Sequence, residues 1–220
     1  FWGCAFHEQF KADAAIMAKM APGTQLVFLY LYYAENTGSV NLTQIAKALS
    51  LSKATCTRAI NDLSASGLIS QTAEGTNKWI TTAYTKSELL EKAYGRLKTP
   101  VDRILYVKGT AQIEHPIASG IRALARQSMI GVNDQDGAIA ISKKEAAKIP
   151  AEDICTKQYF EDFGGAVIEV WSYDPIILER DGCVDDISLL LSMDNDPNER
   201  VQTCLDEIRQ KHGLPIKEEE

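Results

Sequence analysis

The stretch "LSKATCTRAINDLSASGLI", residues 51–69, contains the side chains best placed to bind another molecule. Cys56, Ile60 and Leu63 recur at helical spacing and form a narrow apolar stripe that must face a core. The remaining side chains are hydroxyls, an amide and two cations: Ser52, Lys53, Thr55, Thr57, Arg58 and Asn61. Groups of this kind bind phosphates and base edges. The stretch is therefore predicted to be a helix whose polar face meets a nucleic acid.

The distribution of charge favours the same segment. The 220 residues carry a net charge of −7, which argues against nonspecific coating of nucleic acid. Residues 35–98 contain eight Lys or Arg and five Asp or Glu, a local charge of +3, so the remainder carries −10. If any part of the chain approaches DNA, electrostatics selects this segment.

The elements around this helix predict a winged helix-turn-helix. A capping box of Asn41 and Gln44 opens a preceding short helix, and a tight turn at 50–52 joins the two. The following "LISQTAEGTNKWITTAY" alternates around a Gly-containing tip, as a β-hairpin does. Asn77 and Lys78 in this hairpin are predicted as further DNA contacts. The remaining helices of this domain are expected at 6–20, 24–36, 53–66 and 85–97.

The run "LTQIAKALSLSKATCTRAINDLSASGLI" with its Gly-tipped hairpin resembles the winged helix-turn-helix of MarR-type bacterial transcription regulators. The resemblance covers about residues 22–98. It is carried by two groups of residues, Ser52, Thr55, Thr57 and Arg58, then Asp62, Leu63, Gly67, Leu68 and Ile69. It implies that the helix reads a double-stranded DNA operator. The hairpin departs from many relatives because it has Glu74 and a single cation, Lys78, near its tip.

The chain after "KTP" (98–100) predicts a second domain, because strand-like and helix-like segments alternate there. Strands are expected at 103–109, 137–142 and 165–171. Helices are expected at 117–128, after a capping box at 142–145, and at 197–212, capped by Asp196. The fold class is therefore α+β, with a winged-helix domain at 1–98, an α/β effector or oligomerisation domain at 99–213 and an acidic disordered tail at 214–220. The second domain is similar to uncharacterised winged-helix regulators and faintly to AbiEi-type antitoxin regulators.

Signals for catalysis, metals, cofactors and membranes are weak. The five cysteines form no CxxC pair, which favours reduced thiols in a cytosol. The carboxylates at 134–136 and 194–196 do not continue as calcium loops, and the three histidines are far apart. No apolar run reaches the roughly 20 residues that span a bilayer. We therefore expect no catalytic site, metal or cofactor. The chain begins at Phe1 without a cationic leader, which indicates a truncated chain and no secretory signal.

Together these features predict a cytoplasmic bacterial transcription regulator that binds an operator as a homodimer. The second domain would dimerise, sense a small-molecule or protein effector, or do both, and the helices at 6–20 and 24–36 are candidates for the dimer interface. Two other classes stay open. One is a winged-helix module that contacts proteins without binding DNA, and the other is a nucleotidyltransferase-like enzyme.

Overall fold

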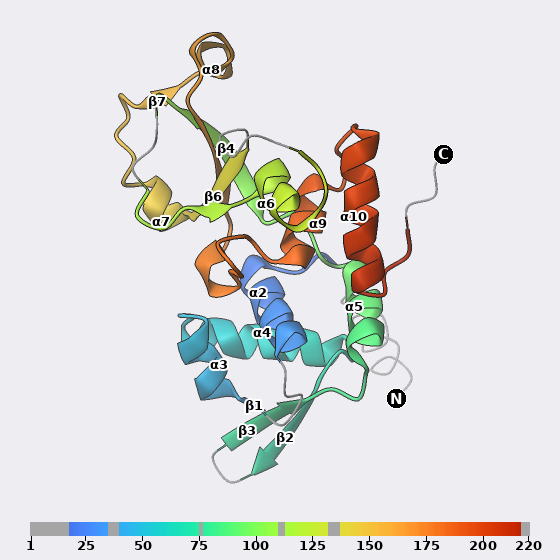
Figure 1. Cartoon of the computed structure of the whole chain (residues 1–220). Coiled ribbons are helices and arrows are strands. Elements are labelled where there is room, and N and C mark those ends of the chain that lie inside the picture. The colour runs from blue at the N-terminus through green and yellow to red at the C-terminus, as the bar shows by residue number, and fades with distance from the viewer. Residues whose placement is uncertain (1–17, 35–39, 75–76, 110–112, 132–136, 217–220) are drawn as a thin grey trace, which may run out of the picture. The chain divides into compact units, whose positions relative to one another are not determined.

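A computed structural model describes residues 18–34, 40–74, 77–109, 113–131 and 137–216 (Figure 1). The chain divides into two compact units, 1–98 with 212–214 and 99–211 with 215–220. The segment 212–214 thus belongs to the first unit, although the sequence analysis assigned it to the second domain and the tail. Leu214, the first residue of the predicted tail, is buried, whereas Pro215 and Ile216 are exposed. The helix expected at 6–20 lies outside the described residues.

The first unit combines four described helices with a small antiparallel sheet. The helices are α2 (Pro22–Tyr33), α3 (Leu42–Ala48), α4 (Lys53–Ala65) and α5 (Lys86–Tyr94). The strands β1 (Val40–Asn41), β2 (Ser70–Glu74) and β3 (Asn77–Thr81) lie in the order β1-β3-β2. Helix α2 is apolar all round because it packs inside the unit against α4 and α5. The buried residues of α2 are covered within the chain, and a part for α2 in a dimer interface stays a prediction.

Side-chain caps fix where these helices begin. Asn41 and Gln44 form the predicted capping box at α3. Thr85 and Glu88 form another at α5, where the Thr85 hydroxyl accepts from the backbone N–H of Glu88 and Glu88 accepts from Thr85 in return. Those hydrogen bonds from Thr85 lower the pKa of Glu88, because they favour its charged form.

The second unit is built on a five-stranded sheet in the order β5-β6-β8-β4-β7. Strands β6 and β8 are parallel, and the other neighbours are antiparallel. The sequence analysis predicted the three long strands and missed the two short ones at the sheet edges. The strands are β4 (Val101–Val107), β5 (Ile117–Ala118), β6 (Ala138–Ser142), β7 (Ile154–Cys155) and β8 (Ala166–Trp171). Together with the winged-helix unit this gives the predicted α+β class.

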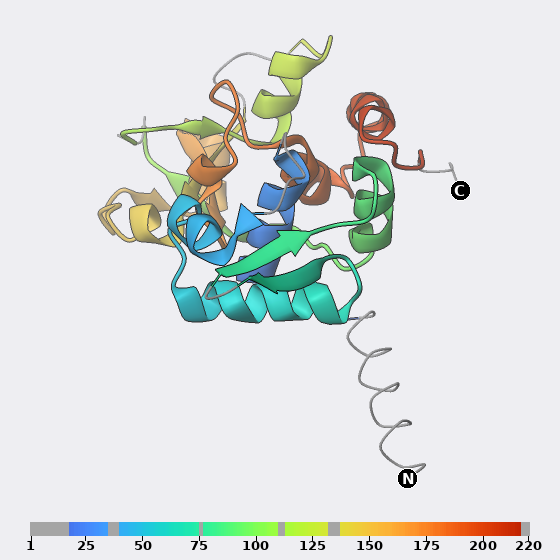
Figure 2. The same ribbon diagram turned by 90° about the horizontal axis from the view of Figure 1, so that it is seen from below.

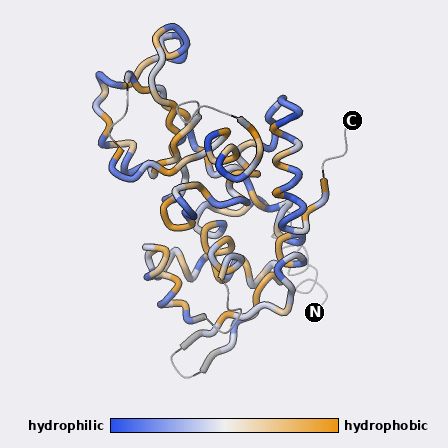
Figure 3. Tube along the Cα trace, viewed as in Figure 1, coloured by the Kyte–Doolittle hydropathy of each residue, from blue (hydrophilic) through white to orange (hydrophobic). Residues whose placement is uncertain are grey.

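Five α-helices of the second unit are described: α6 (Gly120–Gln127), α7 (Lys143–Ala146), α8 (Lys157–Phe163), α9 (Asp186–Met193) and α10 (Glu199–Lys211). Helices α8 and α9 were not predicted. At α7 only half of the predicted capping box forms, because Glu145 pairs with Lys148 instead. At α10 the cap is Asn198 rather than Asp196, since Asn198 accepts from the N–H groups of Arg200 and Gln202. Figure 3 shows the largely hydrophilic character of α10.

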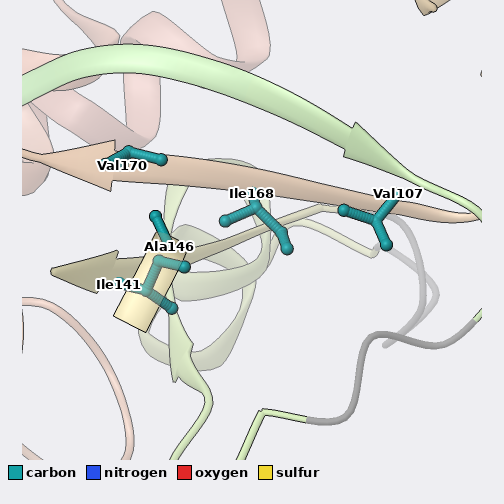
Figure 4. Packing of buried hydrophobic residues seen from close by; sticks show 5 residues of the cluster. All are labelled: Val107, Ile141, Ala146, Ile168 and Val170. Atoms are coloured by element: carbon teal, nitrogen blue, oxygen red, sulfur yellow. The ribbon is translucent and has the colours of Figure 1, made fainter. Parts of the chain in front are cut away.

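One face of the large sheet carries a compact apolar cluster (Figure 4). Alternate residues of β8, Ile168 and Val170, point to this face and meet Val107 of β4 and Ile141 of β6. Ala146 of α7 packs on the same cluster. The opposite face of β8 therefore receives Val167 and Glu169.

This division predicts unequal costs for the same substitution on the two faces. Ile168 is 0% exposed and Ile104 is 50% exposed. Ile168→Ala should lower the free energy of unfolding by about 3 kcal/mol, because it removes buried apolar contacts and leaves a cavity. Ile104→Ala is the matched control and should cost well under half as much. Urea denaturation followed by circular dichroism measures both, and equal losses would contradict the assignment of faces.

Candidate nucleic-acid interface

The amino-terminal end of α4 is a capped turn that carries the first predicted contacts. Ser52 is the N-cap residue, and its Oγ accepts from the backbone N–H of Thr55 at 3.1 Å. Ser52 and Lys53 are both exposed there. The unpaired N–H groups at a helix start attract anions, and an adjacent ammonium group strengthens that attraction. This end of the helix is thus suited to a phosphate.

Arg58 and Asn61 lie on the outward face of α4 together with Ala54 and Ala65, and all four are exposed. The Nε of Arg58 donates to the carbonyl oxygen of Ala54 at 3.4 Å, so the side chain lies back along the helix. The opposite side is buried and consists of Cys56, Ala59, Ile60 and Leu63. The small alanines allow a close approach to α4 from outside, with one guanidinium and one amide between them.

The two threonines are less available than their types suggested. Thr55 is half-buried, and a Cβ built on Gly23 of α2 would lie 2.9 Å from its methyl carbon. Its hydroxyl lies 2.9 Å from Ser52 Oγ. Thr57 is also half-buried, and its hydroxyl donates to the carbonyl oxygen of Lys53 at 2.8 Å. A phosphate contact through either hydroxyl would replace or share an existing hydrogen bond.

Cys56 lies in the core of the winged-helix unit. It is 0% exposed, and its Sγ lies 3.8 Å from the carbonyl oxygen of Leu42. Burial raises the pKa of the thiol, because the thiolate loses hydration. The residue therefore packs as a small apolar side chain.

The hairpin adds one polar group that the sequence analysis missed. Gln71 belongs to β2, the strand that runs beside α4 in Figure 2, and its Nε2 donates to Asn61 Oδ1 at 3.4 Å. Its amide therefore extends the polar face of α4. Gln71 sits ten residues after Asn61, and only the fold brings the two together. Asn77 and Lys78 belong to β3 opposite Glu74 and Ala73, but their side chains lie outside the described part of the structure.

A buried ion pair fixes the orientation of α4. Arg96 is 4% exposed, and its Nη2 donates to both carboxylate oxygens of Asp62, at 2.9 and 3.1 Å. Its Nε donates to the carbonyl oxygen of Ala18 at 2.9 Å. Asp62 lies on the flank of α4 between the buried stripe and the outward face. The pair therefore sets the rotation of the helix about its axis.

The comparison with protein families matches this region. The model of the MarR family matches residues 24–78, which cover most of α2, all of α3, α4 and β2, and the start of β3. Residues 24–78 form a MarR-type winged helix-turn-helix. The predicted resemblance is thereby confirmed for this segment, whereas the AbiEi-like resemblance of the second domain gains no support. Neither the curated proteins nor the solved structures give a significant match to the chain.

The carboxylates and histidines that the sequence analysis considered as metal ligands are the next feature. Among the described residues, no group of three or more His, Cys, Asp or Glu is placed to hold a metal ion. Asp194 pairs with the buried Arg209, and Asp196 accepts from the N–H of Asn198. The carboxylates at 134 and 136 lie outside the described residues. No helix in the described ranges has both the length and the apolar character to cross a bilayer.

The ion pair gives a prediction for stability. Asp62→Ala removes the only carboxylate that the described residues place on Arg96. We expect a loss of about 2–3 kcal/mol, below the range for a fully buried pair because Asp62 is one-third exposed. Thermal and urea unfolding measure the loss.

Asp102→Ala is the matched control. Asp102 accepts from Lys143 at 2.8 Å, but both side chains are largely exposed and water screens their attraction. Its removal should cost clearly less than that of Asp62. If both variants lose the same stability, the Arg96 pair does not fix α4.

Proposed function

We propose that the chain is a sequence-specific transcription regulator whose helix α4 enters the major groove of a double-stranded DNA operator. The outward face of α4 carries this proposal. It places Arg58 and Asn61 between two alanines, while the opposite side of the helix is held in the core. A guanidinium can donate twice to guanine O6 and N7, and an asparagine amide can pair with adenine. Recognition helices of helix-turn-helix proteins enter the groove in this way.

The charged and polar groups around this face support the proposal. Ser52 and Lys53 at the start of α4 are exposed and suited to phosphate oxygens, which position a protein on a duplex. The Gln71 amide lies beside Asn61 and extends the face toward the hairpin. The segment 35–98 carries +3 in a chain of −7, so DNA would be attracted to this side and repelled by the rest.

We further propose that the protein acts as a homodimer in the cytoplasm. A single short helix reads too few base pairs for a unique site, and two half-sites double the footprint. The four described cysteines are free, which suits a reducing compartment. The second unit would supply sensing, dimerisation or both.

Arg58→Ala tests the groove assignment. The duplex would be selected from a random library by the wild-type protein, and affinity would be measured by fluorescence anisotropy. The variant should bind about 10- to 100-fold more weakly, because one bidentate base contact contributes about 1–3 kcal/mol. It should also lose discrimination at one base pair.

Arg200→Ala is the charge-matched control, since Arg200 is exposed at the start of α10 in the second unit. Its affinity should stay within about twofold of wild type, because Arg200 is not part of α4 and its removal changes only a screened charge. Equal effects of the two substitutions would refute the placement of Arg58.

Lys53→Ala tests the phosphate contact at the helix start. It should weaken binding to specific and nonspecific duplexes alike and reduce the slope of log affinity against log salt by about 1. Lys144→Ala, an exposed lysine of α7, is the control and should leave the slope unchanged. A wild-type affinity that does not fall as salt rises would instead favour the protein-interaction module.

A further inference from the structure

The second unit contains an open cavity of about 580 Å³ on the sheet face opposite the apolar cluster. Its volume lies in the range of small-molecule sites. The floor is apolar and includes Ala138 of β6 and Val167 of β8, with Ile121 of α6 and Leu191 of α9 at its sides. All described residues that line it belong to the second unit.

Glu169 stands on this apolar floor in a fixed orientation. Its Oε2 accepts from the hydroxyl of Ser119, which is 0% exposed, and from Trp171 Nε1 at 3.0 Å, which is 1% exposed. Ser119 precedes α6, fifty residues before Glu169, and Trp171 follows Glu169 by two residues on β8. The carboxylate is thereby held by rigid elements, with both anchoring hydrogen bonds on the same oxygen.

The second oxygen of Glu169 faces Gly120. A Cβ on Gly120 would lie 3.7 Å from Oε1, and this glycine has a φ of 54°, which side chains rarely adopt. No hydrogen bond to Oε1 is formed by the described residues, and this oxygen is not sealed from solvent. The glycine thus leaves a charged acceptor accessible within the cavity.

The lining selects for the charge of an occupant. Besides Glu169, the described lining residues include Asp194 and Asp196 but no Lys, Arg or His. Asp194 is matched by Arg209, whereas Glu169 receives only neutral donors. An uncharged molecule that covered the carboxylate would remove its hydration and replace it only in part. A cationic donor forms a stronger, charge-assisted hydrogen bond and offsets that loss better.

We propose that this cavity binds a small organic cation, a primary amine or guanidinium on a short apolar stem. The cationic group donates to Glu169 Oε1, and the stem lies over Val167 and Ala138. This site goes beyond the proposed DNA binding and gives the second unit a ligand of defined chemical class.

The test uses the full chain and three cationic probes, putrescine, agmatine and benzylamine, at constant ionic strength. The readout is the indole ¹H–¹⁵N NMR signal of Trp171, assigned with Trp171→Phe, because its Nε1 hydrogen-bonds to the carboxylate that receives the ligand. We expect a saturable shift with at least one cation and none with 1,4-butanediol or succinate. The absence of a saturable shift with all three cations would overturn the proposal.

Glu169→Gln should weaken binding at least tenfold, because it keeps the shape but removes the charge. Glu152→Gln removes the same charge from an exposed carboxylate outside the cavity and should leave the affinity unchanged. Equal affinity of Glu169→Gln and wild type would also overturn the proposal. Ile121→Trp is a second test, which is needed if Glu169→Gln does not fold. It fills the cavity from α6 without changing the charge of the lining. Loss of binding in this variant supports the site, and unchanged binding refutes it. DNA affinity is measured separately, so failure here leaves the α4 assignment untouched.

Discussion

The buried guanidinium of Arg96 is the constraint on which the direction of α4 depends. Removed from water, it needs charge and hydrogen bonds, and among the described residues Asp62 and the carbonyl of Ala18 supply them to Nη2 and Nε, while Nη1 has no partner. Apolar contacts of Ile60 and Leu63 also hold the helix, but such contacts are non-directional and tolerate a small rotation. The two hydrogen bonds from Arg96 Nη2 to the carboxylate of Asp62 are directional, so they do not tolerate such a rotation. The outward direction of Arg58 is therefore set by Asp62, which lies one turn further along α4 on the flank of the outward face.

Helix α2 binds residues at two of the points where the chain passes between the units, Lys98 and His212. The side chain of Gln25 binds both backbone groups of Lys98, donating to its carbonyl at 2.8 Å and accepting from its N–H at 3.0 Å. Tyr32 Oη lies 2.7 Å from His212 Nδ1. The same helix packs along α4. These contacts fix both segments to the helix that supports α4 within the winged-helix unit.

The recognition helix could be predicted because its determinants are local. A stripe of period 3.6 after a tight turn predicted a helix over 53–66, and the structure has Lys53–Ala65 with Ser52 as the N-cap. The same pattern could not show how wide the buried side is. Thr55 was grouped with the outward hydroxyls, yet it stands on the flank that meets Gly23 of α2. A helical pattern gives the angle of each residue, whereas the neighbouring helix decides which angles are covered.

The cavity around Glu169 could not be predicted in this way, because its parts meet only through the order of the strands. Strand periodicity places Glu169 and Trp171 on one face. Ser119, however, follows β5, which lies two strands away across β6 in a sheet whose order is not the order of the sequence. The only sign of this site in the local sequence was the charge of Glu169. A carboxylate within an apolar strand costs free energy unless donors or water meet it, so Glu169 in "VIEVW" indicated that polar partners were needed. Two of those partners are in the protein, and the oxygen they leave open is the reason to look for a third.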